Sequence, residues 1–207
     1  MEHLTNEEII LAGLGGTSPR SSNIKMDIGA SKYRKHFIER VRLLPKNIQS
    51  ALKTHKAQIE DAPFYATAEL TGTRTELIKL STPEEITITN IDNGKLGKDQ
   101  HLTLSAIKLL YDAKSIEGSF TDPFPRELLN GEWELVLNGK KVFRKQQIRN
   151  FHDGFYGYQV NKPFGLYELG NPKQISPQTP IEFNLNTKRP VEGFVKVSFE
   201  GTVVSTF

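Results

Sequence analysis

The stretch Ile181-Glu-Phe-Asn-Leu-Asn186 decides the fold class of this chain, because apolar and polar residues alternate along it. Successive side chains of a β-strand point to opposite faces, so this period of two gives the segment one apolar face for a core. The same period recurs after the turn at residues 187–190, in Phe194–Phe199, and again in Thr202–Thr206. The last quarter of the chain therefore predicts paired strands of a β-sheet.

Segments with the same period extend back to residue 64. The expected strands are Phe64–Thr71, Thr75–Leu80, Glu85–Ile91, His101–Tyr111, Glu132–Leu137, Lys141–Arg144 and Phe155–Val160. Within His101–Tyr111 the apolar positions change parity, which predicts a β-bulge. Asn138-Gly139 predicts a two-residue hairpin, since a type I′ turn needs positive φ at both central residues. Short strands with long loops at residues 112–131 and 161–180 predict a mainly β fold, a single β-sandwich of jelly-roll type.

Residues 1–61 carry helical signals instead. Thr5 and Glu8 form a capping box for a helix over about residues 5–12, and the Gly15-Gly16 pair lies just after its end. A hinge rich in Ser, Gly and Pro follows, and then apolar residues recur at helical spacing on both sides of Pro45: Tyr33, Phe37, Val41 and Leu44, then Ile48, Leu52, His55 and Ile59. We therefore expect an N-terminal helical arm over residues 1–61 and a β-domain over residues 62–207.

The first helix is too short to be stable alone in water, so we expect it to dock on its own β-domain, another subunit or a membrane surface. Its apolar side chains are the candidate assembly contacts, namely Leu4, Ile9, Ile10 and Leu11. The start of the chain is acidic and this apolar run is short, so we expect no secretory signal. The sequence has no cysteine, which excludes disulfides and thiolate metal sites.

Positive charge is concentrated in the arm. Residues 32–56 hold 8 Lys/Arg against the single Glu39, whereas residues 62–207 hold 17 of each sign. The candidate contacts for a genome or for anionic lipid are Lys32, Arg34, Lys35, Arg40 and Arg42. Such residues neutralise phosphates, although the same pattern also describes the solvated face of amphipathic helices.

The residue types that catalysis commonly uses do not form a recognisable catalytic pattern in this sequence. Glu132 and Glu134 share one face of an expected strand, as the carboxylates of a glycosidase would, but Lys140 and Lys141 across the hairpin make cross-strand ion pairs the preferred interpretation. The five histidines lack metal-ligand spacing, and the glycines of residues 13–18 follow a helix, whereas a phosphate loop precedes one. We therefore expect no catalytic residue, no metal and no cofactor.

An aromatic run follows the expected hairpin, and its candidate surface residues are Phe155, Tyr156 and Tyr158. Phe151, Phe164 and Tyr167 flank them in the sequence. Such a group can form a platform for sugars or bases, and it can equally fill the end of a sandwich or a subunit contact.

Three segments carry a resemblance to a known family: Asn130-Gly-Glu-Trp-Glu-Leu-Val-Leu-Asn-Gly139, Thr179-Pro-Ile-Glu-Phe-Asn-Leu185 and Val195-Lys-Val-Ser-Phe-Glu-Gly-Thr-Val203. With them the β-domain resembles the jelly-roll capsid and vertex (penton) proteins of tailless icosahedral phages. The resemblance implies assembly without catalysis, and N-terminal arms that reach neighbours, genome or membrane. Major capsid proteins of this group commonly carry two jelly rolls, whereas this β-domain has room for one, as a single-roll capsid, penton or minor shell protein would.

The expected function is that of a virion subunit assembled in the host cytoplasm. Its expected partners are copies of itself, other shell proteins and, through the basic arm, nucleic acid or an internal membrane, with no small-molecule substrate. An alternative is a β-sandwich module that binds carbohydrate or a host surface through the aromatic residues. An enzyme acting on glycosides through the two glutamates is a third possibility.

Overall fold

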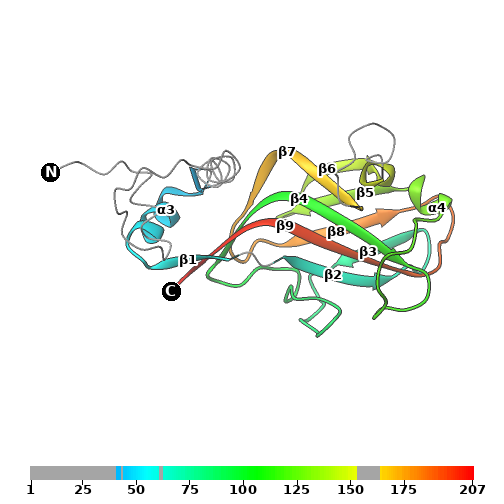
Figure 1. The fold of residues 1–207 in the computed structure, drawn as a ribbon, viewed down its shortest axis with the longest axis horizontal. Helices are drawn as coiled ribbons and strands as arrows, with labels where there is room; N and C mark the ends of the chain where they lie inside the picture. Colours follow the sequence, from blue (N-terminus) through cyan, green and yellow to red (C-terminus); the bar gives the residue numbers. More distant parts are fainter. Residues whose placement is uncertain (1–40, 43, 61–62, 153–163) are drawn as a thin grey trace, which may run out of the picture.

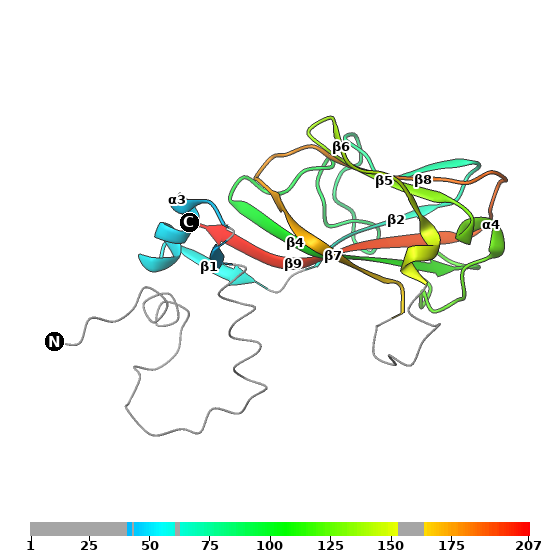
Figure 2. The same cartoon turned by 90° about the horizontal axis from the view of Figure 1, so that it is seen from above.

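The structure is a computed structural model that describes residues 41–42, 44–60, 63–152 and 164–207. Two antiparallel sheets pack face to face, which confirms the expected mainly β fold and β-sandwich (Figures 1 and 2). The first sheet contains β1 (Ala57–Glu60), β2 (Phe64–Glu69), β4 (Gln100–Asp112), β7 (Leu166–Ile175) and β9 (Phe194–Thr206). The second contains β3 (Arg74–Ile78), β5 (Glu132–Leu137), β6 (Lys140–Gln147) and β8 (Ile181–Asn186). The described helices are α3 (Lys46–Lys53), α4 (Arg126–Leu129) and the 3₁₀ turn η1 (Ile148–Phe151).

The strands pair as the two halves of one long hairpin. β5 pairs with β6, and the strands on either side then pair outward in order: β4 with β7, β3 with β8 and β2 with β9. Consecutive pairs alternate between the sheets, so the hairpin is rolled into a sandwich. The resulting orders are β2-β9-β4-β7 and β3-β8-β5-β6, with β1 also on β9. β2 and β3 therefore lie at one edge of the sandwich, and β7 and β6 lie at the opposite edge.

The core follows the apolar alternation that the sequence predicts. In β9, Val195 and Val197 are fully buried between the sheets. In β5, Trp133 and Leu135 are fully buried on the inner face, while Glu134 points outward. β5 and β8 have the bounds that we expected, because each has one strictly apolar face.

The predicted hairpin and bulge are confirmed. Asn138 and Gly139 have φ of 50° and 71°, as a type I′ turn requires, and they connect β5 to β6. The register between β4 and β9 shifts between Leu104 and Ala106, so one extra residue lies in β4. This bulge lets β4 keep its apolar side chains on the core face despite the change of parity.

Two strands that we expected at the C-terminus form one. β9 runs unbroken from Phe194 to Thr206, so the break expected between Phe199 and Thr202 is wrong. Gly201 lies opposite the bulge of β4, where a Cβ atom would collide with the carbonyl oxygen of Thr103. The glycine therefore serves the close approach of two backbones within the sheet.

Two further expectations fail in the connections. The strand expected over Glu85–Ile91 is wrong, because these residues form a turn within the loop between β3 and β4. The region 161–180, which we expected to be a loop, contains the ten-residue strand β7. β7 is an edge strand in which half of the residues are exposed and only Leu169 and Ile175 are buried, so it has no apolar alternation to reveal it.

The helical segment expected as far as Ile59 is shorter than predicted. α3 begins after Pro45, as expected, but it ends at Lys53, and residues 57–60 form strand β1. His55 adopts a φ of 57°, and the amides of His55 and Lys56 donate to the carbonyls of Leu52 and Ala51. This is a Schellman motif, which ends the helix with a histidine where glycine is usual. The division at residue 61 stays a prediction.

Candidate functional site

Most of the predicted contact residues lie outside the part of the chain that the structure describes. These are Leu4, Ile9, Ile10, Leu11, Lys32, Arg34, Lys35, Arg40, Phe155, Tyr156 and Tyr158. Arg42 is described and is exposed. The amide side chain of Gln49 donates to the carbonyl oxygens of Arg42, at 3.2 Å, and of Leu44, at 2.8 Å. These bonds fix the chain before α3 to the helix itself.

Helix α3 docks on the end of the first sheet. Its inward side chains Ile48 and Leu52 form a second apolar cluster with Val41, Leu44, Ala57 and Val204. Val204 is fully buried on the face of β9 opposite to the main core, so α3 covers the outer face of the sheet at this point. We call α3, β1 and this cluster the helical lobe. Figure 2 shows the lobe at one end of the sandwich, beside the end of β9.

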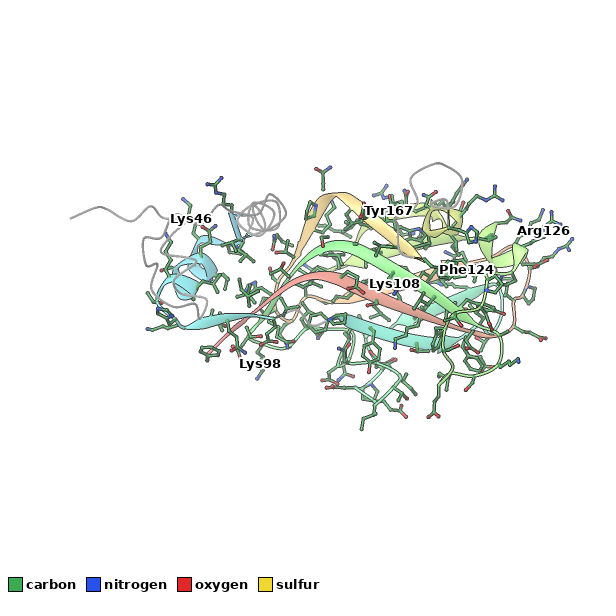
Figure 3. The ribbon with its side chains drawn as sticks, in the orientation of Figure 1. Lys46, Lys98, Lys108, Phe124, Arg126 and Tyr167 are labelled. Atoms are coloured by element: carbon green, nitrogen blue, oxygen red, sulfur yellow. The ribbon has the colours of Figure 1, made fainter. Side chains whose placement is uncertain are left out.

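The outer side of the helical lobe carries cations. Lys46 and Lys56 are exposed, and Figure 3 shows Lys46 on α3 at the end of the molecule far from Arg126. The side chain of Lys46 points to solvent because the opposite side of α3 holds the apolar cluster. This part of the basic segment can therefore meet an anionic surface without disturbing the docking of the helix.

A polar groove of about 550 Å³ lies on the outer face of the second sheet. The carboxylates of Glu132, Glu134 and Glu182 line it together with the cations of Lys141 and Lys145. Both carboxylate oxygens of Glu134 accept hydrogen bonds from Lys141 Nζ, at 3.0 and 2.9 Å. The expected cross-strand ion pair is thus confirmed for this pair of residues.

The groove arranges its charges for mutual neutralisation. Cross-strand neighbours on this face are Glu132 with Asn186, and Glu134 with Asn184. Glu134 is only 8% exposed, and Lys141 covers it and supplies the opposite charge. Removing Lys141 would leave a nearly buried carboxylate unpaired, which marks the pair as part of the framework of the sheet.

The flanking aromatic residues belong to the core. Trp133 contacts the rings of Phe143, Phe151, Tyr167 and Phe183 at centroid distances of 5.3–5.5 Å. Figure 3 shows Tyr167 on β7, from where its ring meets the indole edge to face. Phe164 packs against Phe124 and His152. Of the two interpretations that the sequence left open, filling of the sandwich is confirmed for Phe151 and Tyr167.

The long loop after β4 is organised by a buried carboxylate. Asp112 accepts hydrogen bonds from the amides of Lys114 at 2.9 Å, Ser115 at 3.0 Å and Phe120 at 3.3 Å. These bonds favour the ionised form and lower the pKa of Asp112 below its usual range. The neighbouring Tyr111 donates its hydroxyl to the carbonyl oxygen of Glu192, and burial raises its pKa. The loop is therefore a fixed structure and presents a defined surface.

The described ranges contain neither a metal-binding cluster nor a membrane-spanning helix. No group of three or more His, Cys, Asp or Glu side chains there is arranged to hold a metal ion. None of the helices in those ranges has the length and hydrophobicity that crossing a bilayer requires. A scan of protein-family models and a search of curated proteins found no match to this chain.

Sequence reasoning missed two surfaces, the exposed turn around Ile86 and the basic edge of β6. Ile86 lies in a segment whose alternation imitates a strand. The charges of β6 were counted together with the rest of residues 62–207, where Lys/Arg and Asp/Glu are equal in number, so its local excess of Lys/Arg was missed. A count of charge by segment would have found the second surface, since residues 139–152 contain five Lys/Arg and no Asp/Glu.

Proposed function

We propose that this chain is a structural subunit of a phage virion, a capsid or vertex protein built on one jelly roll. It assembles with copies of itself and with other shell proteins in the host cytoplasm. Its N-terminal arm contacts neighbours, and the basic part of the arm faces nucleic acid or an internal membrane. No catalytic step and no cofactor form part of this proposal.

The observation that carries the proposal is the nesting of the four strand pairs. β5–β6, β4–β7, β3–β8 and β2–β9 enclose one another and alternate between the sheets. An eight-stranded sandwich of two Greek keys, the jelly roll, has this wrapping, and viral capsid domains are among its main users. Fold alone does not establish function, so the assignment to a virion also needs the resemblance.

The segments that carry the resemblance support the proposal by their positions. Residues 130–139 contain β5 and the hairpin turn, residues 179–185 contain most of β8, and residues 195–203 form the middle of β9. β5 and β8 are hydrogen-bonded neighbours, and Phe183 of β8 packs against Phe199 of β9. The resemblance therefore concerns one connected part of the sandwich.

Light scattering of the purified full chain across a series of protein and salt concentrations tests the proposal, with electron microscopy of the assembled fraction. We expect discrete oligomers, and we expect a chain that begins at residue 17 to keep the fold but to assemble poorly. A strict monomer at every concentration would contradict the proposal. Glycan binding by that monomer would instead favour the carbohydrate-binding alternative.

A further inference from the structure

One apolar side chain on the surface is presented to solvent almost completely. Ile86 is 90% exposed, more than Leu80 at 46% and Phe207 at 76%, which are other exposed large apolar residues of the described chain. Glu84 and Glu85 precede it and are exposed as well. Residues 80–94 contain three acidic residues and no Lys/Arg. We call the turn Glu84–Ile88 the acidic knob.

The knob is held firmly against β2. The amide of Thr67 donates to the carbonyl oxygen of Ile88 at 2.7 Å, and the hydroxyl of Thr89 donates to the carbonyl oxygen of Tyr65 at 2.9 Å. The amide of Tyr65 donates to the side chain of Asn90 at 2.7 Å. The loop therefore covers the free edge of β2 and fixes the position from which the knob projects.

The tip of the knob contains backbone strain. The amide of Ile88 donates to the carbonyl oxygen of Glu85, so residues 85–88 form a β-turn, and Thr87 at its third position has a φ of 71°. Glycine or asparagine normally occupies such a position, because a β-branched side chain is strained there. Strain of this kind clusters at binding sites. Here it accompanies the outward presentation of an isoleucine.

The opposite edge of the sandwich is basic. β6 exposes Lys140, Lys141, Arg144 and Lys145, and Lys141 alone among these four has a carboxylate partner, Glu134, within the described ranges. Its pairing with β5 shifts register twice, and Lys145 has a φ of 47°. One shift lies between the pairs Trp133–Gln146 and Leu135–Phe143. It places Arg144 and Lys145 together opposite Glu134, which brings two cations to one point of the edge.

Both edges are closed to strand addition but open to side-chain contacts. The loop segment covers β2, whereas bulges and lysines are the usual protection of an edge such as that of β6. β6 also contains Val142, which is half-buried and lies between Lys141 and Arg144 in the sequence. An acidic surface with one apolar centre thus lies on one edge, and a basic surface with an apolar residue lies on the other.

We propose that the acidic knob of one copy binds the basic β6 edge of a second copy, with Ile86 buried at the centre of the contact. The charges of the two surfaces are complementary, and the surfaces lie at opposite edges of the sandwich. The contact is therefore head to tail, and repetition of such a contact closes a ring when the rotation allows it. This inference rests on the proposed self-assembly and names the surfaces that carry it.

Charge reversal on each side, alone and combined, tests the contact. The variants are Glu84→Lys/Glu85→Lys, Arg144→Glu/Lys145→Glu and the fourfold combination of these changes. All four side chains are exposed, so we expect each variant to fold. Glu117→Lys/Glu127→Lys is the matched control, because it reverses two exposed charges elsewhere. Sedimentation and light scattering measure self-association, and circular dichroism confirms the fold.

We expect each double variant to associate about ten- to a hundredfold more weakly than the original chain, and the fourfold variant to recover most of this loss. Ile86→Ser weakens association about tenfold or more, because the apolar burial is lost. If the original chain associates and the double variants associate equally well, this contact is overturned and the assembly proposal stands. The same holds if the fourfold variant does not recover the association that the double variants lose. A monomeric wild-type chain overturns the assembly proposal itself.

Discussion

Two neighbouring residues of β9 belong to different parts of the molecule. Val203 is buried in the main core between the sheets, and Val204 is buried under α3 in the helical lobe. The main core is enclosed by eight strands, whereas the lobe cluster has six buried residues among those described, which come from α3, the chain before it, Ala57 of β1 and Val204 of β9. Stability is distributed unevenly in such a molecule, and a small satellite cluster opens at a lower free energy than the core.

The largest expected effect comes from the centre of the main core. Trp133→Ala removes a fully buried ring that contacts four other aromatic rings, and we expect a loss of about 3–5 kcal/mol in the free energy of unfolding. Trp133 is the only tryptophan, so circular dichroism must follow the denaturant unfolding of this variant.

Trp133→Phe is the informative companion. It keeps an aromatic ring and removes an indole N–H that has no hydrogen-bond partner among the described residues. We expect it to cost clearly less than the alanine change. Equal losses for the two variants would contradict the view that ring packing dominates at this position.

A smaller and local effect is expected in the helical lobe. Leu52→Ala removes a side chain that is 2% exposed, at a cost of about 2–4 kcal/mol to the docking of α3. Amide hydrogen exchange should then accelerate in α3 and β1, while the unfolding midpoint reported by Trp133 fluorescence stays nearly unchanged. Lys46→Ala on the exposed side of α3 is the control. A shift of the fluorescence midpoint as large as that of a core variant would show that the lobe and the sandwich unfold as one unit.

The smallest expected effect is a pH dependence of the lobe. His101 lies opposite Val204 in the sheet, and burial lowers its pKa below the ordinary value of 6.5. As the pH falls, the unfolded chain therefore takes up a proton on His101 before the folded chain does. The contribution of neutral His101 to stability is fully present above about pH 6.5 and is lost between there and the lower pKa of the folded state. Hydrogen exchange in β1 should accelerate over this range in the original chain and not in His101→Gln. An identical pH response in both would assign the effect to other groups.

The accuracy of the sequence prediction follows how each strand is buried. β5 and β8 were predicted at their true bounds, because each is central in its sheet and keeps one strictly apolar face. β7 has an exposed outer edge and a polar sequence around Gly170-Asn171-Pro172, so no period marks it. Edge strands satisfy fewer constraints, and their sequences carry less information.

The candidate contact surfaces were harder to predict for a different reason. In residues 85–91, Ile86 and Ile88 share the alternation of a strand and Ile91 breaks it, yet the fold buries Ile91 at 2% exposure and presents Ile86 to solvent. Only the hydrogen bonds from this loop to β2, made across more than twenty residues, separate the two. The basic edge of β6 likewise depends on a double shift of register that local alternation does not encode.

The rolled hairpin has a consequence for synthesis of the chain on the ribosome. Every strand before the turn at Asn138-Gly139 pairs with one after it, and Phe64 of β2 pairs with Phe199 of β9. The chain must therefore be translated through β9 before the first sheet can be completed, and until then the apolar faces of β2 and β4 lack their partner. Contacts so distant in sequence make folding slow, and late-completed sheets are exposed to aggregation. A nascent chain of this kind has particular need of chaperones.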